Sequence, residues 1–201
     1  LYHKAGFLVH GMFIFGYPLP EGARLPLSTG ERVDRFRTFI KKTRLDTIQV
    51  LLPVPLPGTE MTDRLKGQNR IFSHEIVGWE YYDGNFPLFE PDDPLTPEEM
   101  QLAIRKIMGR FYRFRSMFSI GLNILTFPAM IFSFFNIKIG WRKWYRMWRN
   151  DLLRFGGWIT IKQWTSDFKK SSFNSKLRRA KEKLQESGEA ARTFSDESPS
   201  R

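Results

Sequence analysis

The sequence predicts an α/β fold followed by a mainly helical, basic extension. Three observations predict it: two apolar stretches that suit strands, helices with clear capping signals, and a positive charge confined to the C-terminal third. The chain has 201 residues, of which 41% are hydrophobic and 15% aromatic, so it is large enough for one core and an appendage.

The first half of the chain reads as strand, helix, strand. Residues 6–17 form an almost unbroken apolar run, which is typical of a strand covered on both faces. Ser28 and Glu31 have the spacing of a capping box at the start of a helix, and residues 45–52 suit a second buried strand. This order predicts a βαβ unit with two parallel strands.

The middle of the chain alternates short elements with loops. A helical turn is expected at residues 60–66 and a strand or extended segment at 71–79. Prolines and an Asp-Gly pair make residues 80–97 a long loop, in which Tyr81-Tyr82-Asp83 suits either a substrate lid or an aromatic plug. Thr96-Pro97-Glu98-Glu99 then predicts a well-capped helix that continues to Phe111.

An uncharged segment of 21 residues, from Met117 to Ile137, is long enough to span a bilayer. Pro128 near its middle predicts two apolar helices rather than one. They would either pack on the preceding domain or enter a membrane surface.

The net charge of +11 lies entirely between Lys138 and Leu184, where 14 Lys or Arg residues face three acidic ones. Within this stretch, residues 141–164 interleave Trp with Arg, and three interpretations stay open. The tryptophans could pack on the protein, lie at a membrane surface with the basic residues on anionic lipid, or stack on single-stranded nucleic acid. An amphipathic helix is expected at residues 173–184.

No metal or nucleophile motif is present in the sequence. There is no cysteine, and His3, His10 and His74 are too far apart in sequence to match a known metal-ligand spacing. No Walker loop, dinucleotide fingerprint or nucleophile elbow occurs. The chain therefore shows no independent catalytic machinery.

Two motifs resemble the radical S-adenosylmethionine superfamily. Gly16-Tyr17-Pro18 is similar to the Gly-x-Pro turn after a late barrel strand, and Pro55-Leu56-Pro57-Gly58-Thr59 to the Pro-x-Pro-Gly-Thr loop after a following strand. The resemblance covers residues 6–112. It implies that residues 1–112 are the C-terminal part of a partial parallel β/α barrel, followed by a helical, basic accessory region at 113–187 and a disordered tail at 188–201.

The same resemblance implies a cofactor site at the carboxyl ends of the strands, where loops face the active site in parallel barrels. The expected cofactor-binding residues are Gly16, Tyr17, Pro18, Gln49, Pro57 and Gly58. Glycines at such positions let the backbone approach a ligand closely. Gln49 could equally satisfy a neighbouring backbone group.

The implied activity is cleavage of S-adenosylmethionine by a 4Fe-4S cluster, which yields a 5′-deoxyadenosyl radical that acts on a substrate of unknown identity. Because the chain lacks cysteine and begins at Leu1, we expect it to be the C-terminal part of a longer enzyme whose cluster ligands lie elsewhere. Some relatives also bind cobalamin. The alternative is a non-enzymatic module that binds a membrane surface or nucleic acid. The expected location is the cytoplasm, with membrane association through residues 117–164.

Overall fold

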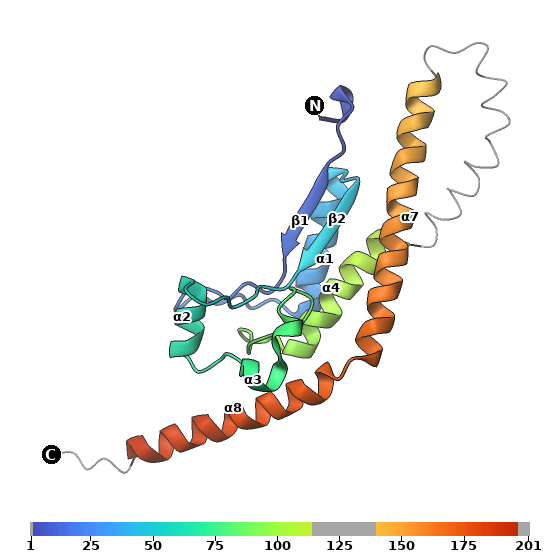
Figure 1. Cartoon of the computed structure of the whole chain (residues 1–201). Helices are drawn as coiled ribbons and strands as arrows, with labels where there is room; N and C mark the ends of the chain where they lie inside the picture. Colours follow the sequence, from blue (N-terminus) through green and yellow to red (C-terminus); the bar gives the residue numbers. More distant parts are fainter. Residues whose placement is uncertain (1, 114–139, 197–201) are drawn as a thin grey trace. The chain divides into compact units, whose positions relative to one another are not determined.

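The structure, a computed structural model, describes residues 2–113 and 140–196 (Figure 1). The described residues form two compact units, each assembled from non-consecutive segments. Unit 1 takes in those of Leu1–Phe13, Val33–Val50 and Arg105–Asp167, and unit 2 those of Ile14–Arg32, Leu51–Ile104 and Phe168–Arg201. In chain order, the elements are η1 (Tyr2–Ala5), β1 (His10–Ile14), α1 (Thr29–Thr43), β2 (Thr47–Leu51), α2 (Glu60–Gly67), α3 (His74–Val77), η2 (Trp79–Tyr81), α4 (Pro97–Phe111), α7 (Gly140–Lys170) and α8 (Phe173–Asp196).

The predicted partial barrel is wrong for the part of the chain that the structure describes. The protein is a small, mostly helical α/β protein in which β1 and β2 pair in one two-stranded parallel sheet. The predicted order of strand, helix and strand is present as β1, α1 and β2.

Hydrogen bonds on the outer edge of β2 explain why the sheet stops there. In unit 1, the Tyr112 hydroxyl accepts a bond from the Ile48 N–H (2.9 Å) and donates one to the Ile48 carbonyl (2.7 Å). In unit 2, the N–H of Leu52, directly after the strand, donates to the Gly84 carbonyl (2.7 Å). Groups that a further strand would use are therefore already bonded.

Strand β1 is covered on one face, and the prediction of burial on both faces is wrong. Phe13 packs edge-on against Phe36 and Phe39 of α1, with ring centroids 6.0 and 5.9 Å apart. The alternating side chains of Met12 and Ile14 are 68% and 55% exposed. The apolar residues therefore form an ordinary strand in which alternate side chains are exposed and only one face is covered.

Unit 1 holds α7 against the rest of its core through Tyr112. A Cβ on Gly157 of α7 would lie only 2.3 Å from Cε1 of Tyr112, so glycine is needed for this close approach. Tyr112 is 6% exposed, and its burial raises the pKa of the phenol. The residue joins β2, the end of α4 and α7 within one unit.

Unit 2 has a core rich in aromatic residues. Helix α8 packs on α3, and the apolar stripe expected at residues 173–184 is confirmed by the burial of Phe173, Leu177 and Ala180. Outside the stripe, Lys181 pairs with Glu98 at 2.8 Å. Helix α8 continues to Asp196, through residues for which the composition predicted a disordered tail.

The helix starts in unit 2 follow their local signals. The N–H of Ser28 donates to the Glu31 carboxylate (2.9 Å), and the N–H of Glu31 donates to the Ser28 hydroxyl (3.3 Å), as a capping box requires. Thr96 and Glu99 form the same reciprocal pair at the start of α4.

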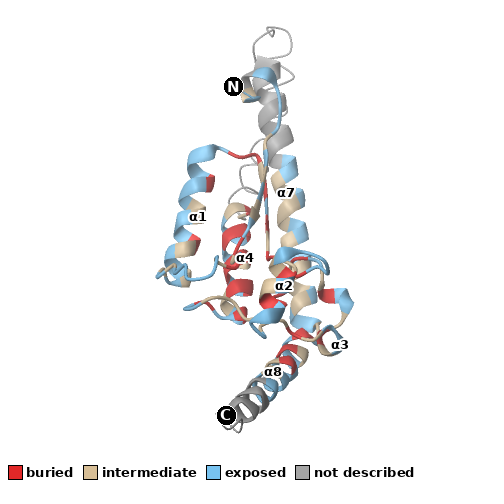
Figure 2. Cartoon of the chain, turned by 90° about the vertical axis from the view of Figure 1, so that its left-hand side faces the viewer, coloured by how far each residue is buried: buried red, intermediate tan, exposed pale blue. Residues whose placement is uncertain are grey.

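Burial follows the expected stripe of α4, which carries many of the buried side chains (Figure 2). Of the strand or extended segment expected at residues 71–79, only an isolated bridge between Ile71 and Phe89 is present, and the short helices α3 and η2 follow it. Among the residues described, no helix is both long and apolar enough to cross a membrane. The uncharged segment 117–137 lies outside them.

Candidate functional site

The first candidate loop follows β1 and lies in unit 2. The N–H of Phe15 donates to the Leu51 carbonyl (2.9 Å), which extends the pairing past the end of the strand. Gly16 has a φ of +75°, and a Cβ there would lie 2.5 Å from Cε of Met100. Gly16 is therefore favoured by its backbone conformation, and an added side chain would also need the end of Met100 to shift. Tyr17 is 57% exposed, whereas Pro18 is fully buried.

The second candidate loop follows β2 in the same unit. Pro53 and Pro55 are buried, and the loop then becomes exposed through Pro57 and Gly58. Gly58 has a φ of +79°, and a Cβ built there meets no atom within 4 Å. The space beside this glycine is open, as the close approach of a ligand would require. Thr59 caps α2 by accepting a hydrogen bond from the N–H of Thr62 (3.3 Å).

A hydrogen bond ties the two loops together within unit 2. Arg64 lies on α2, which starts directly after Gly58 and Thr59, and its guanidinium donates to the carbonyl of Pro18 (3.2 Å). The structure thus links the turn at residues 16–18 to the helix that follows residues 57–58. Five of the six predicted site residues belong to these two loops.

Gln49, the sixth predicted residue, lies in unit 1. Its neighbours Ile48 and Val50 are 3% and 0% exposed, while Gln49 itself is exposed on the opposite face of β2. Among the described residues its side-chain amide has no hydrogen-bond partner, so it does not serve a neighbouring backbone group. The amide is accessible to a ligand.

These residues fit the adenosyl part of the implied cofactor but not its iron–sulfur cluster. Tyr17 offers an exposed aromatic face, and flat bases stack on such rings. The amide of Gln49 has donors and an acceptor suited to a base edge. In contrast, the sequence has no cysteine, and the described residues include no group of three or more His, Cys, Asp or Glu side chains that could hold a metal ion.

Unit 2 also contains a cavity of about 790 Å³ that the sequence did not indicate. Its wall includes Arg70 and Asp92, whose side chains pair at 2.8 Å. Asp92 also accepts a 2.6 Å hydrogen bond from the N–H of Leu19, next to the first candidate loop. Burial lowers the pKa of Arg32, and the charge of Asp92 opposes that shift. The negative charge of Asp92 therefore offsets the positive charges of Arg70 and Arg32.

The remaining candidates have structural partners. His3 bonds to Asp46 (2.8 Å), and His10 bonds to the Thr47 hydroxyl (2.8 Å). Tyr81 is 8% exposed and packs on the rings of Phe86 and Phe173, which favours the aromatic plug over a substrate lid.

The structure describes the side chains of only some tryptophans in residues 141–164. The side chains of Trp141, Trp144 and Trp148 lie outside the described part. Trp158, farther along α7, is half-buried, and the ammonium of Lys162 lies 5.1 Å from the centre of its ring.

Comparison with known proteins finds no relative that would assign the chain to a family. No protein-family model matches it, and no curated protein or solved structure shows significant similarity to it. A functional assignment therefore has to come from the residues themselves.

Proposed function

We propose that this chain is part of a radical S-adenosylmethionine enzyme and contributes to the pocket for the adenosyl group. The contributing residues, both in unit 2, are Tyr17 and Gly58 with its open backbone. When bound with its cluster, S-adenosylmethionine supplies a 5′-deoxyadenosyl radical. The chain's own residues would hold and orient the adenosyl group. Under this proposal the cysteine ligands of the 4Fe-4S cluster lie outside this sequence, and a cobalamin domain would lie there too.

One observation carries the proposal: two loops that follow neighbouring parallel strands are tied together, and both present exposed groups. Ligands of α/β proteins commonly bind beyond the carboxyl ends of parallel strands. Tyr17 is 57% exposed in a turn otherwise anchored by the buried Pro18. A role in stacking accounts for that exposure. A cytoplasmic location belongs to the same proposal.

The test is the affinity for S-adenosylmethionine of a reconstituted protein that contains both this chain and the cluster-binding cysteines. Tyr17→Ala should raise the Kd roughly tenfold, because stacking of a base on an aromatic ring contributes about 1–3 kcal/mol. Gly16→Val is unsuitable, since Gly16 has a φ of +75°, at which any side chain is strained.

Tyr2→Ala is the matched control, because Tyr2 is 66% exposed and lies far from both loops in the sequence. It should leave the Kd unchanged, and the iron content should be the same in all variants. Unchanged affinity in Tyr17→Ala would remove this residue from the pocket. A wild-type protein that assembles a cluster but binds no S-adenosylmethionine would overturn the proposed function itself.

A further inference from the structure

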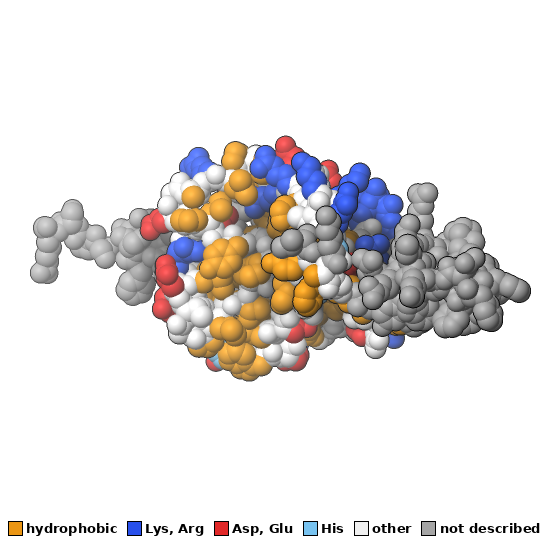
Figure 3. Space-filling model, turned by 90° about the horizontal axis from the view of Figure 1, so that it is seen from above, with side chains coloured by type: hydrophobic (Ala, Val, Ile, Leu, Met, Phe, Trp, Pro, Cys, Tyr) orange, Lys and Arg blue, Asp and Glu red, His pale blue; other side chains and the backbone are white. Residues whose placement is uncertain are grey.

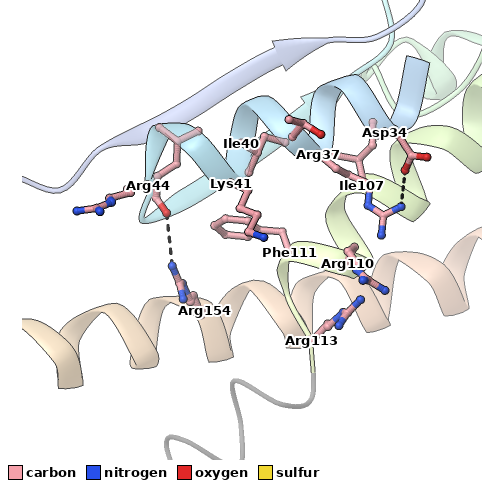
Figure 4. Close-up of a pocket in the computed structure, with 12 residues that line it drawn as sticks. Asp34, Arg37, Ile40, Lys41, Arg44, Ile107, Arg110, Phe111, Arg113 and Arg154 are labelled. Carbon is pink, nitrogen blue, oxygen red and sulfur yellow. Dashed lines mark hydrogen bonds and ion pairs between the residues drawn. The ribbon is translucent and has the colours of Figure 1, made fainter. Parts of the chain in front are cut away.

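Unit 1 contains a cavity of about 700 Å³ lined by α1, the turn after it, the end of α4 and one residue of α7 (Figure 4). Among its described lining residues, six have basic side chains and one, Asp34, has a carboxylate. The basic residues are Arg37, Lys41, Arg44, Arg110, Arg113 and Arg154. We call this cavity the basic pocket.

Two of the six basic groups have partners in the protein. Arg37 pairs with Asp34 (2.8 Å), whose side chain is 72% exposed. The guanidinium of Arg154 donates to the carbonyls of Leu45 and Asp46 (3.4 Å each) and lies 5.2 Å from the centre of the Phe111 ring. These contacts position the two arginines without cancelling the charge of the pocket.

The other four basic groups have no carboxylate partner among the described residues. They are Lys41, Arg44, Arg110 and Arg113. Figure 4 shows Arg37, Arg110 and Arg113 directed to the same side of the cavity. Bringing like charges together costs free energy unless an anion is present, and a phosphate fits the fork of an arginine especially well.

A purely structural explanation covers only part of this arrangement. Lys41 and Arg110 lie in the last turns of α1 and α4, where cations interact favourably with the helix dipole. That effect acts on each helix separately and does not require the two ends to face one cavity. The convergence of α1, α4 and α7 on it is the feature that indicates a ligand.

The surroundings of the pocket favour a lipid phosphate over a soluble one. Close to the lining residue Arg154 in the sequence, Leu152 and Leu153 of α7 in unit 1 are apolar and exposed (49% and 40%). In the sequence, Arg113 is also followed closely by the uncharged residues 117–137. Seen from above, Lys and Arg side chains gather on one part of the surface, beside hydrophobic ones (Figure 3). Basic and apolar groups side by side are typical of membrane-surface contacts.

We propose that the basic pocket binds the phosphate of an anionic phospholipid headgroup at a membrane surface. Each basic residue near an anionic bilayer contributes about 1 kcal/mol, and salt weakens this part. Neutralising three of them should therefore lower the affinity on the order of a hundredfold at low salt.

The experiment measures sedimentation with vesicles of phosphatidylcholine alone and of phosphatidylcholine in which about one lipid in three is phosphatidic acid, so that the surface is anionic. The test variant is Lys41→Gln/Arg44→Gln/Arg110→Gln. The matched control is Arg35→Gln/Lys42→Gln/Lys106→Gln, which removes the same charge from exposed positions of α1 and α4 outside the pocket. Melting temperatures confirm that both variants are folded.

We expect the wild type and the control to bind the acidic vesicles, the test variant to lose most binding, and none to bind phosphatidylcholine alone as strongly. Equal losses in both variants would show general charge attraction and overturn the pocket. Tight binding of glycerol 3-phosphate without vesicle binding would assign the pocket to a soluble phosphate and overturn the lipid. Binding of single-stranded RNA without vesicle binding, or binding of no probe, would also overturn the proposal.

Discussion

The cavities of the two units are similar in size but differ in how their charges are compensated. In unit 2, Asp92 meets Arg70 directly and is also bonded to the backbone of Leu19. In the basic pocket of unit 1, the described lining residues include six basic side chains and one carboxylate, Asp34, which is largely exposed and pairs with Arg37. The first cavity is balanced by the protein itself, whereas the second requires an external anion for balance. An arginine-lined cavity therefore indicates a ligand only when its own unit leaves the charge uncompensated.

Asp92→Ala should have the largest effect, because it removes the compensation on which unit 2 depends. It would leave the N–H of Leu19 without its acceptor and remove the ion pair of Arg70, whose guanidinium would keep its hydrogen bonds to Glu90 and Gln68. We expect a loss of about 2–3 kcal/mol in the free energy of unfolding, measured by urea denaturation. Asp93→Ala, at the exposed neighbouring position, should cost less than about 0.5 kcal/mol. Equal costs for both would contradict the central role of Asp92.

Tyr112→Phe tests whether unit 1 is stabilised by neutral hydrogen bonds instead of charge pairs. The change leaves both backbone groups of Ile48 without a partner in a buried position. We expect a loss of about 1–2 kcal/mol by the same measurement, with no change in vesicle binding. Tyr2→Phe, at an exposed position, should have no measurable effect on stability. A stability loss below about 0.5 kcal/mol for Tyr112→Phe would mean that the two hydrogen bonds of its hydroxyl contribute little to the stability of unit 1.

The triple variant Lys41→Gln/Arg44→Gln/Arg110→Gln should change stability by less than about 0.5 kcal/mol, and upward at low salt. The reason is that relief of repulsion between like charges offsets the small loss of helix-dipole interactions. Thermal melts at two salt concentrations check this outcome. A large loss would mean that the basic residues of the pocket serve the fold.

Glu90→Gln should produce the smallest effect, and one that depends on pH. Burial raises the pKa of the Glu90 carboxyl, so between its unfolded pKa of about 4.3 and its folded pKa the folded state holds more protons than the unfolded one. The free energy of unfolding therefore falls as pH rises through this window. Glu90→Gln should remove that fall and slightly raise the melting temperature at pH 7, but not at pH 4. An identical pH profile for wild type and variant would contradict it.

The features that could be predicted from the sequence are those set by neighbouring residues. The capping boxes at Ser28 and Thr96 and the stripe of α8 depend on spacings of three or four positions, and they formed as expected. The extent of the sheet could not be predicted, because Tyr112 closes the edge of β2 from 64 positions away.

The candidate loops were recognisable from their motifs, but the reasons for their glycines were not. Gly16 has a positive φ and packs against Met100, a residue far along the chain, whereas Gly58 has open space beside it. The basic pocket had no local signal at all, since it combines residues as distant as Arg37 and Arg154.

The two hydrogen bonds between Tyr112 and Ile48 affect on which side another strand can join the sheet. A side-chain hydroxyl occupies both ladder groups of Ile48 and leaves nothing there for a new strand to pair with. In the described part of the chain, no strand pairs with the outer edge of β1. Any segment that joins this sheet therefore has to add beside β1, and uncontrolled edge-to-edge association is restricted to that one side.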